Sequence, residues 1–260
     1  MNDYRPLTSE EIEVLKSNDC WAEDWTSINV SEDFKPNYMH RVMLYGEVNI
    51  GAFNKNVEVS QGFVKHSGIN NATLRNVTIG DDCLIENVGN FINNYTIGDD
   101  CYISNISTME TTEGATFGEG NLVSVLNEVG EGNVILFSDL NSQLAAFMVK
   151  HFSDKELKEN IRHLIKTDIE NKAPERGQIG SNVKIVNTKE ITNCVINDLC
   201  EVNGASRLSD CTLLGSVHGN VYIGTGVIIE HSIIAEGSSV INRVKIQDCF
   251  VGEACQRSNG

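Results

Sequence analysis

The chain has 260 residues, and its 36 acidic and 20 basic side chains give a formal net charge of −16. This balance argues against nucleic acid as a partner, because binding a phosphate backbone requires a basic face. No apolar run approaches the roughly 18 residues of a membrane helix. The opening MNDY is not a signal peptide, so we expect a cytoplasmic protein without a membrane partner.

The opening 49 residues differ from the rest of the chain, and we expect them to form an N-terminal cap (residues 1–49). Thr8-Ser-Glu-Glu11 is a capping box ahead of apolar residues, which predicts a short helix. Trp21 and Trp25 follow, and we expect both indoles to cover the open end of the next domain.

A six-residue period dominates the remainder, and the hexapeptide TIGDDC occurs at both 78–83 and 96–101. The longest apolar runs at this period are Ile79, Ile85, Phe91, Ile97, Ile103, Met109, Ala115 and Leu199, Ala205, Cys211, Val217, Ile223, Ile229, Ala235, Ile241, with Val57, Phe63, Ile69 as a shorter one. A period of six does not fit a helix but suits short strands joined by tight turns. Three units make a coil of 18 residues that stacks on the next at about 4.8 Å. The sequence therefore predicts a parallel β-helix shaped as a triangular prism.

A helical pattern interrupts the repeat and divides it into two β-helical segments, 50–136 and 178–260, on either side of an insert at 137–177. Leu140, Leu144, Phe147, Met148 and Phe152 fit one amphipathic helical face. Ser153-Asp-Lys-Glu156 is a second capping box, so we expect an inserted helical hairpin. A new coil begins at Val251 and stops at Gly260 without a capping element, and we expect the native protein to continue.

The pattern aliphatic–Gly–x–x–small–x, as in Ile79-Gly80 to Cys83, resembles the hexapeptide repeat of left-handed parallel β-helix proteins. These include bacterial acyltransferases acting on sugar nucleotides and amines, and the C-terminal domains of sugar-nucleotide pyrophosphorylases. The resemblance implies an all-β fold, a left-handed parallel β-helix with an N-terminal helical cap and the inserted hairpin. The left hand comes from the family, because general chirality rules favour a right-handed crossover.

The N-terminal block, with Leu7-Thr-Ser-Glu-Glu-Ile12 and Asp19-Cys-Trp-Ala-Glu-Asp-Trp25, also resembles a bacterial family of unknown function. Its members look longer and are often labelled as related to UDP-N-acetylglucosamine pyrophosphorylase. Such enzymes carry a GxGxR loop in a nucleotide-binding α/β domain before their β-helix. This chain has neither that loop nor a βαβ pattern, so nucleotidyltransferase activity is not expected.

Two histidines are candidates for a general base. The resembling acyltransferases use an outward-facing His between subunits to take a proton from the acceptor, which requires a neutral imidazole near pH 7. His66 and His231 follow inward positions by three and two residues, so both are expected to point outward. His66 also lies where the apolar register slips, and loops that carry function collect at such places. The alternative for each is an ordinary surface histidine.

The segment around His66 is basic in an otherwise acidic chain, which suits an anionic acyl-CoA or sugar nucleotide. The candidate substrate-binding residues are Lys65, Asn70, Asn71 and Arg75.

Cysteines and aspartates of the repeat have architectural interpretations. The eight cysteines form no CxxC pair, so no zinc is expected. Cys83 and Cys101 are expected to fill small inner slots of the coil. Asp81, Asp82, Asp99 and Asp100 would stack at one corner, either as solvated turn residues, which we favour, or as a cation site of the calcium type.

Two functions remain open. The first is an acyltransferase-like protein acting on a sugar nucleotide or related small molecule, with acyl-CoA as donor and a homotrimer as the assembly. The second is a non-catalytic β-helix that binds a sugar nucleotide or mediates assembly. The fold alone does not decide between an enzyme and a binding module.

Overall fold

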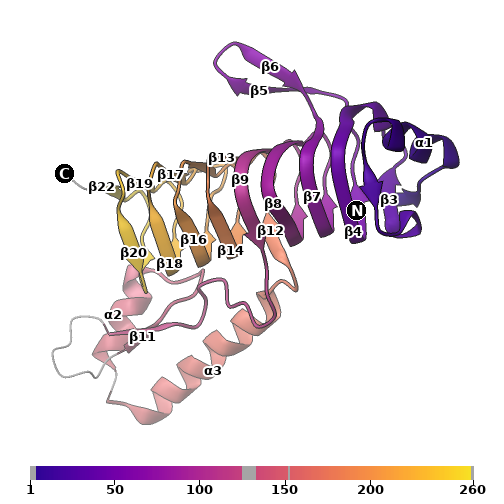
Figure 1. Cartoon of the computed structure of the whole chain (residues 1–260). Helices are drawn as coiled ribbons and strands as arrows, with labels where there is room; N and C mark the ends of the chain where they lie inside the picture. The colour runs from indigo at the N-terminus through magenta and orange to yellow at the C-terminus, as the bar shows by residue number, and fades with distance from the viewer. Residues whose placement is uncertain (1–3, 125–132, 152, 259–260) are drawn as a thin grey trace.

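The computed structural model describes residues 4–124, 133–151 and 153–258. Within these residues, eighteen strands join one sheet, and two antiparallel hairpins stand apart from it. The all-β class expected from the sequence is confirmed. Figure 1 shows the sheet as successive coils, with the N-terminal region at one end and the C-terminus at the other.

The strands before the insert are β1 (Tyr4–Pro6), β2 (Trp21–Ala22), β3 (Ile28–Ser31), β4 (Met39–Ile50), β5 (Asn56–Ser60), β6 (Phe63–His66), β7 (Gly68–Ile79), β8 (Leu84–Ile97), β9 (Tyr102–Glu110), β10 (Leu122–Ser124) and β11 (Asn133–Ile135). Those after it are β12 (Gly177–Ile179), β13 (Lys184–Val186), β14 (Glu190–Ile196), β15 (Glu201–Asn203), β16 (Arg207–Leu213), β17 (Tyr222–Ile223), β18 (Ile228–Ile234), β19 (Ser239–Ile241), β20 (Lys245–Gln247), β21 (Phe250–Val251) and β22 (Gln256–Ser258). The helices are α1 (Ser9–Ser17), α2 (Ser142–Lys150) and α3 (Lys155–Lys172), with 3₁₀ turns at Trp25–Ser27 and Pro36–Tyr38.

Three rows of buried aliphatic side chains run through the coils and form the core. Parallel pairing places Ile50, Ile79, Ile97, Ile179, Ile196, Leu213, Ile234 and Val251 in one row. The second row is Met39, Ile69, Ile85, Ile103, Ile185, Val202, Ile223 and Val240. The third is Leu44, Leu74, Ile92, Met109, Ile191, Leu208, Ile229 and Ile246. Burying these rows supplies the main driving force for the fold.

The coil length expected from the sequence holds in one place and changes in others. Asp81 and Asp99 occupy equivalent positions 18 residues apart, but after the insert Ser181 and Asp198 are equivalent at a spacing of 17. A strict period of six therefore drifts out of register. Phe91, expected inside, is only partly buried while Ile92 is fully buried, and Val217 is 81% exposed.

Glycine is required at one corner of the coils that include Gly80, Gly98 and Gly180, because neighbouring coils approach closely there. At Gly80 an added Cβ would lie 2.3 Å from Asp99 Oδ1 and 2.8 Å from the carbonyl carbon of Gly98. At Gly98 it would lie 2.8 Å from the carbonyl carbon of Gly180. The Gly of each Ile-Gly pair is therefore explained by the lack of space for a side chain between stacked coils.

Aspartates at the same corner bind one coil to the next. Asp81 Oδ1 accepts the amide of Ala52 at 2.7 Å, and Asp99 Oδ1 accepts the amide of Asp81 at 2.8 Å. Beyond the insert, Asp198 Oδ1 accepts the amide of Ser181 at 2.7 Å. Backbone donors that the turn would leave unpaired are satisfied in this way.

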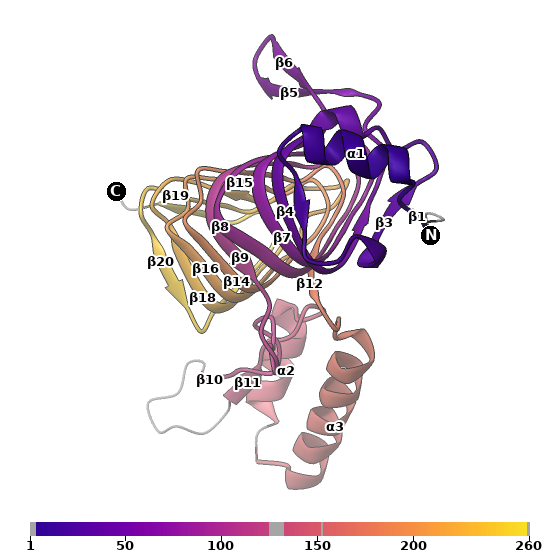
Figure 2. The ribbon, with the colours of Figure 1, turned by 45° about the vertical axis from the view of Figure 1, so that its right-hand side comes forward.

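The N-terminal region packs against the first coil (Figure 2). The predicted capping box is confirmed, since Thr8 caps α1 and Glu11 bonds back to the Thr8 amide. The prediction for Trp21 is wrong, because it is 49% exposed and lies against Tyr45 at 5.3 Å between ring centroids. Leu15 of α1 is instead fully buried in the core.

Strands β5 and β6 form a hairpin that projects from the coils, here called the arm (residues 56–66; Figure 1). The sequence assigned Val57 and Phe63 to the inner register. The structure places both in the arm, where Phe63 is 54% exposed. An irregular spacing in the repeat thus marks a segment that leaves the coil.

The insert begins earlier than the boundary at 136 indicates, because the main sheet is left after Glu110 and re-entered at Gly177. Strands β10 and β11 form a separate hairpin and are followed by α2 and α3, so the insert contains two helices, as the sequence indicated. Asp154, not Ser153, caps α3. Phe152, expected on an amphipathic face, lies outside the described residues.

Candidate functional site

His66 lies at the foot of the arm, where its ring is fixed on two sides. It stacks in parallel on Tyr38, with ring centroids 3.7 Å apart and an interplanar angle of 9°. Its Nδ1 lies 2.9 Å from the backbone oxygen of Ser67. A carbonyl oxygen can only accept, so Nδ1 carries the proton and Nε2 is the basic nitrogen of the neutral ring. Within the described residues Nε2 has no hydrogen-bond partner.

The approach of Tyr38 depends on Gly68, the first residue of β7. A Cβ at Gly68 would lie 2.4 Å from the backbone oxygen of Tyr38 and 3.1 Å from its Cβ. Any side chain at Gly68 would therefore push Tyr38 away from His66.

Lys65, the neighbour of His66, belongs to a buried polar network. Its Nζ lies 2.8 and 3.0 Å from the two carboxylate oxygens of Glu86, which is 8% exposed. Glu86 also accepts from the Tyr102 hydroxyl at 3.2 Å and from Ser104 Oγ at 3.3 Å. Burial is the main cause that raises the pKa of Tyr102, so its hydroxyl keeps its proton at neutral pH. The network fixes the foot of the arm on the sheet.

The other predicted substrate-binding residues spread over β7. Asn70 shares a parallel row with His40 of β4 and Glu86 of β8, so it lies beside the Lys65 network. Asn71 is exposed, and its side-chain amide reaches Asn87 at 3.4 Å.

Arg75 is exposed further along the strand, in register with Tyr45 and Asn93. The structure therefore brings His66, Lys65 and Asn70 to the arm foot and leaves Asn71 and Arg75 outside the Glu86 network.

Sequence reasoning missed Tyr38, Glu86, Tyr102 and Ser104. A usable signal existed for Glu86, which occupies the same position of the repeat as Ser104 and is a carboxylate in a strand that is otherwise apolar or neutral. Tyr38 gave no signal, because it lies in a 3₁₀ turn just before β4, ahead of the residues where the sequence repeat is visible.

His231 lies on β18, near the insert and away from the arm (Figure 1). Its Nδ1 is 3.6 Å from Asp248 Oδ1, and both side chains are about half exposed. The Asn121 side-chain amide also donates to the His231 backbone oxygen, at 3.2 Å. A pair at this distance and exposure holds the ring far less firmly than the contacts of His66.

Two clefts lie between the insert and the outer face of the coils. One cleft, of about 900 Å³, is lined by residues of the insert and of the coils, including Ser138, Leu140, Leu214, Asp248 and Phe250. The other, of about 500 Å³, contains Glu119 and Lys172. Burial is the main cause that raises the pKa of Glu119, whose carboxylate accepts from the amide and hydroxyl of Ser138. Hydrogen bonds to Asp139 and then Asp168 raise the pKa of Lys172.

The chain belongs to the DUF4954 family. A model of this family, described as a domain of unknown function, matches residues 4–259. An uncharacterized protein of Treponema pallidum (strain Nichols) is 26% identical over 256 residues, which cover 91% of this chain and 34% of that protein. The chain thus spans about a third of that relative's length.

The repeat residues of this family member serve architecture. Cys83 and Cys101 are fully buried, as expected for small inner slots. Hydrogen bonding with Cys101 and burial raise the pKa of Cys83, which leaves it a poor nucleophile. Across residues 4–124, 133–151 and 153–258, no three His, Cys, Asp or Glu side chains form a metal-binding group. No helix of the described chain is both long and apolar enough to cross a membrane.

Of the corner acids considered for a cation site, Asp82 and Asp100 face Lys55. Its Nζ lies 3.2 Å from Asp82 Oδ2 and 2.8 Å from Asp100 Oδ1. Asp82 Oδ1 also accepts the backbone amides of Asn54 and Lys55. These oxygens therefore hold the chain where it leaves for the arm.

Proposed function

We propose that the coil is a left-handed parallel β-helix of the hexapeptide-repeat type, and that the chain acts as an acyltransferase on a sugar nucleotide or related small molecule. Parallel strands stacked at spacings of 18 and 17 residues support the fold assignment. The glycine corner and the three aliphatic rows are further support. The proposal includes acyl-CoA as donor and a homotrimer as the assembly.

The state of the His66 ring carries the functional proposal. A general base needs a ring nitrogen with a free lone pair and a fixed direction. The hydrogen bond from Nδ1 to Ser67 and the stack on Tyr38 meet both needs, because they place the lone pair of the neutral ring on Nε2 and restrict rotation of the ring.

The proposed reaction proceeds by attack of the acceptor on the thioester. His66 Nε2 takes the proton from the acceptor hydroxyl or amine as its oxygen or nitrogen bonds to the thioester carbonyl carbon. The carbon–sulfur bond then breaks, and the imidazolium returns its proton to the departing thiolate, which gives the acylated acceptor and free CoA. The bond from Nδ1 to Ser67 persists throughout, because Nδ1 donates in both protonation states.

The experiment measures acetyl transfer by the full chain. Acetyl-CoA is the donor, a UDP-linked amino sugar is the acceptor, and the released CoA thiol is followed with a thiol-reactive dye. Removing a general base typically costs about 10²- to 10⁴-fold in rate, so we expect His66→Asn to lose at least about 100-fold. Binding of acetyl-CoA by calorimetry should stay within about twofold of wild type.

Two controls make the result specific. His218→Asn removes an exposed histidine that lies outside the arm foot and should leave the rate unchanged. Activity that survives in His66→Asn, or that is lost in His231→Asn with His66 intact, would overturn the assignment of His66. A monomer by light scattering would contradict the trimer.

The ion pairs at the arm foot favour a non-catalytic function. Lys65 is paired with Glu86, and Lys55 with two aspartates, so these cations hold the arm in place and are less available to the phosphates of acyl-CoA. The second function, a non-catalytic module that binds a sugar nucleotide or mediates assembly, would use residues outside these pairs. This alternative predicts that UDP-N-acetylglucosamine binds the full chain without any acyl transfer. Binding equally tight in His66→Asn would support it.

A further inference from the structure

Helix α3 carries two adjacent stripes, each repeating every four residues. Lys158, Arg162 and Lys166 form a cationic stripe, and Ile161, Ile165 and Ile169 form an aliphatic stripe beside it. Residues four apart lie one above the other on a helix surface. The two stripes therefore run side by side along α3.

The aliphatic stripe forms one wall of an open groove. The groove, of about 440 Å³, lies between α3 and the β10–β11 hairpin, and Ile165, Ile169, Leu122 and Ile135 contribute its apolar surface. Ile165 is 5% exposed at the floor, whereas Leu122 is 53% exposed on the opposite wall. The apolar surface is thus recessed and only partly covered by the protein itself.

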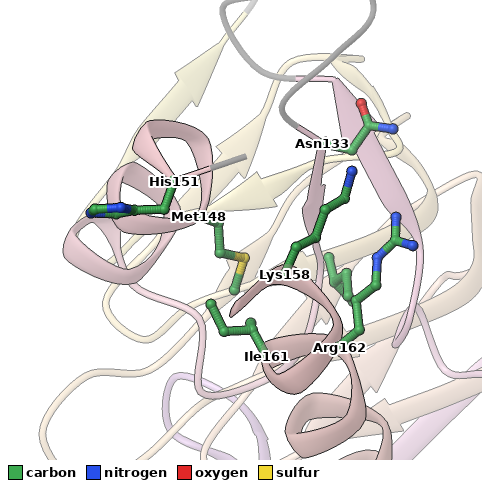
Figure 3. Close-up of a pocket in the computed structure, with 7 residues that line it drawn as sticks. Asn133, Met148, His151, Lys158, Ile161 and Arg162 are labelled. Atoms are coloured by element: carbon green, nitrogen blue, oxygen red, sulfur yellow. The ribbon is translucent and has the colours of Figure 1, made fainter. Parts of the chain in front are cut away.

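The cationic stripe forms the edge of this groove. Arg162 and Ile135 also line a smaller hollow of about 20 Å³, which extends the groove toward Lys158 and His151. Figure 3 shows Lys158 and Arg162 rising from α3 on the same side, toward Asn133. Within the described residues neither makes an ion pair.

Among the residues that the structure describes, the charges of Lys158 and Arg162 are not offset by ion pairs. Lys166 pairs only with Glu170, at 3.6 Å and with both side chains largely exposed, and such surface pairs contribute little. In a chain with a net charge of −16, cations along one apolar groove that have weak or no ion-pair partners among the described residues favour an anionic, partly apolar occupant.

We propose that this groove binds an acidic amphipathic helix of a partner protein. From Lys158 to Lys166 the stripe extends about 12 Å at 1.5 Å per residue. A partner helix with acidic side chains every four residues, beside an aliphatic stripe, would place its acids opposite the cationic stripe and its aliphatic side chains opposite the aliphatic stripe of α3. One phosphate or carboxylate would meet only one or two of the cations.

The shape of the groove argues against a lipid surface. Membrane-binding helices present their apolar face outward so that it enters the headgroup region. Here Ile165 is buried at the floor of the groove. A helix lying in the groove can contact it, whereas a flat bilayer surface cannot.

The probe is an 18-residue helical peptide, blocked at both ends and fluorescently labelled, with Leu at helical spacing on one face and Glu along one flank. Binding to the full chain is measured by fluorescence anisotropy. We expect saturable binding that weakens as salt rises from 50 to 300 mM, because exposed charges are screened. The same peptide with Lys in place of every Glu should not bind.

The double substitution Lys158→Glu with Arg162→Glu should weaken binding by at least about tenfold, which corresponds to about 1.4 kcal/mol. Lys189→Glu together with Lys184→Glu makes the same charge change on the coils and should stay within about twofold. Leu122→Glu alters an exposed wall residue and should also weaken binding, and circular dichroism checks that each variant is folded.

Three results would overturn the proposal. These are no binding of the acidic peptide, equal binding by the wild type and the Lys158/Arg162 double variant, and binding of phosphatidylglycerol vesicles with none of the peptide. The last result would identify the groove as a lipid-binding surface.

Discussion

Substituting Gly98 by Ala tests whether close stacking at the corner determines the repeat. The new Cβ would lie 2.8 Å from both the carbonyl carbon of Gly180 and Ser181 Oγ, where ordinary contacts begin at 3.4 Å. Overpacking of this kind costs about 1–3 kcal/mol. Ala recovers about 0.4–1 kcal/mol by restricting the unfolded chain, so we expect a net loss of about 1–2 kcal/mol.

Gly252 is the matched control, because it follows Val251 at the equivalent corner and a Cβ there meets no atom within 4 Å. Thermal unfolding followed by circular dichroism is the assay. For a chain of this size the loss at Gly98 corresponds to a fall in Tm of about 3–6 °C, whereas Gly252→Ala should melt at or slightly above wild type. Equal shifts in the two variants would refute the stacking argument.

Two further predictions concern single side chains. The hydrogen bond from Arg5 is the main cause that lowers the pKa of Glu11 from 4.5 to about 2. Its stabilising effect is complete above pH 4.5 and is lost as pH falls toward 2, so Arg5→Gln should flatten this acid-side slope and raise the Glu11 pKa measured by NMR titration. Tyr95 is fully buried, and its hydroxyl accepts the Cys194 amide at 3.1 Å. Tyr95→Phe leaves the Cys194 amide without its acceptor and should lower the free energy of unfolding in urea by about 1–3 kcal/mol. An unchanged free energy would show that the amide finds another acceptor.

The sequence was sufficient to predict the core of the fold, because the repeat is enforced by local geometry. Ile79 and Ile97 must point inward, and Gly80 and Gly98 must lack side chains. The same residue types therefore recur one coil, or 18 residues, apart. Both helices of the insert were also predictable from their apolar spacing.

Departures from the period were not predictable, because they depend on contacts distant in sequence. The arm leaves the coil, but its sequence still has apolar residues at the six-residue spacing. Phe63 therefore fits the period by coincidence. After the insert, the coil that contains Val217 has 21 residues, because Val202 pairs with Ile223 and Leu213 with Ile234, and Val217 lies on the surface. The stack of Tyr38 on His66 joins residues from a turn and a hairpin, and no spacing rule connects them.

Only part of the candidate site could therefore be predicted from the sequence. His66 and Lys65 could be chosen because they lie at a register slip in a basic segment. Glu86, which pairs with Lys65, could be found only by knowing which coil faces the arm.

The corner contacts continue across the insert as though it were absent. Ile97 pairs directly with Ile179, and the Asp99 amide reaches Ser181 Oγ at 3.2 Å. The insert is a closed loop, because Glu110 before it pairs with Asn93 and Gly177 after it pairs with Tyr95, two residues further along the same strand. The entropy of closing such a loop grows only with the logarithm of its length, so this junction can accept segments of very different size at nearly constant cost to the coil.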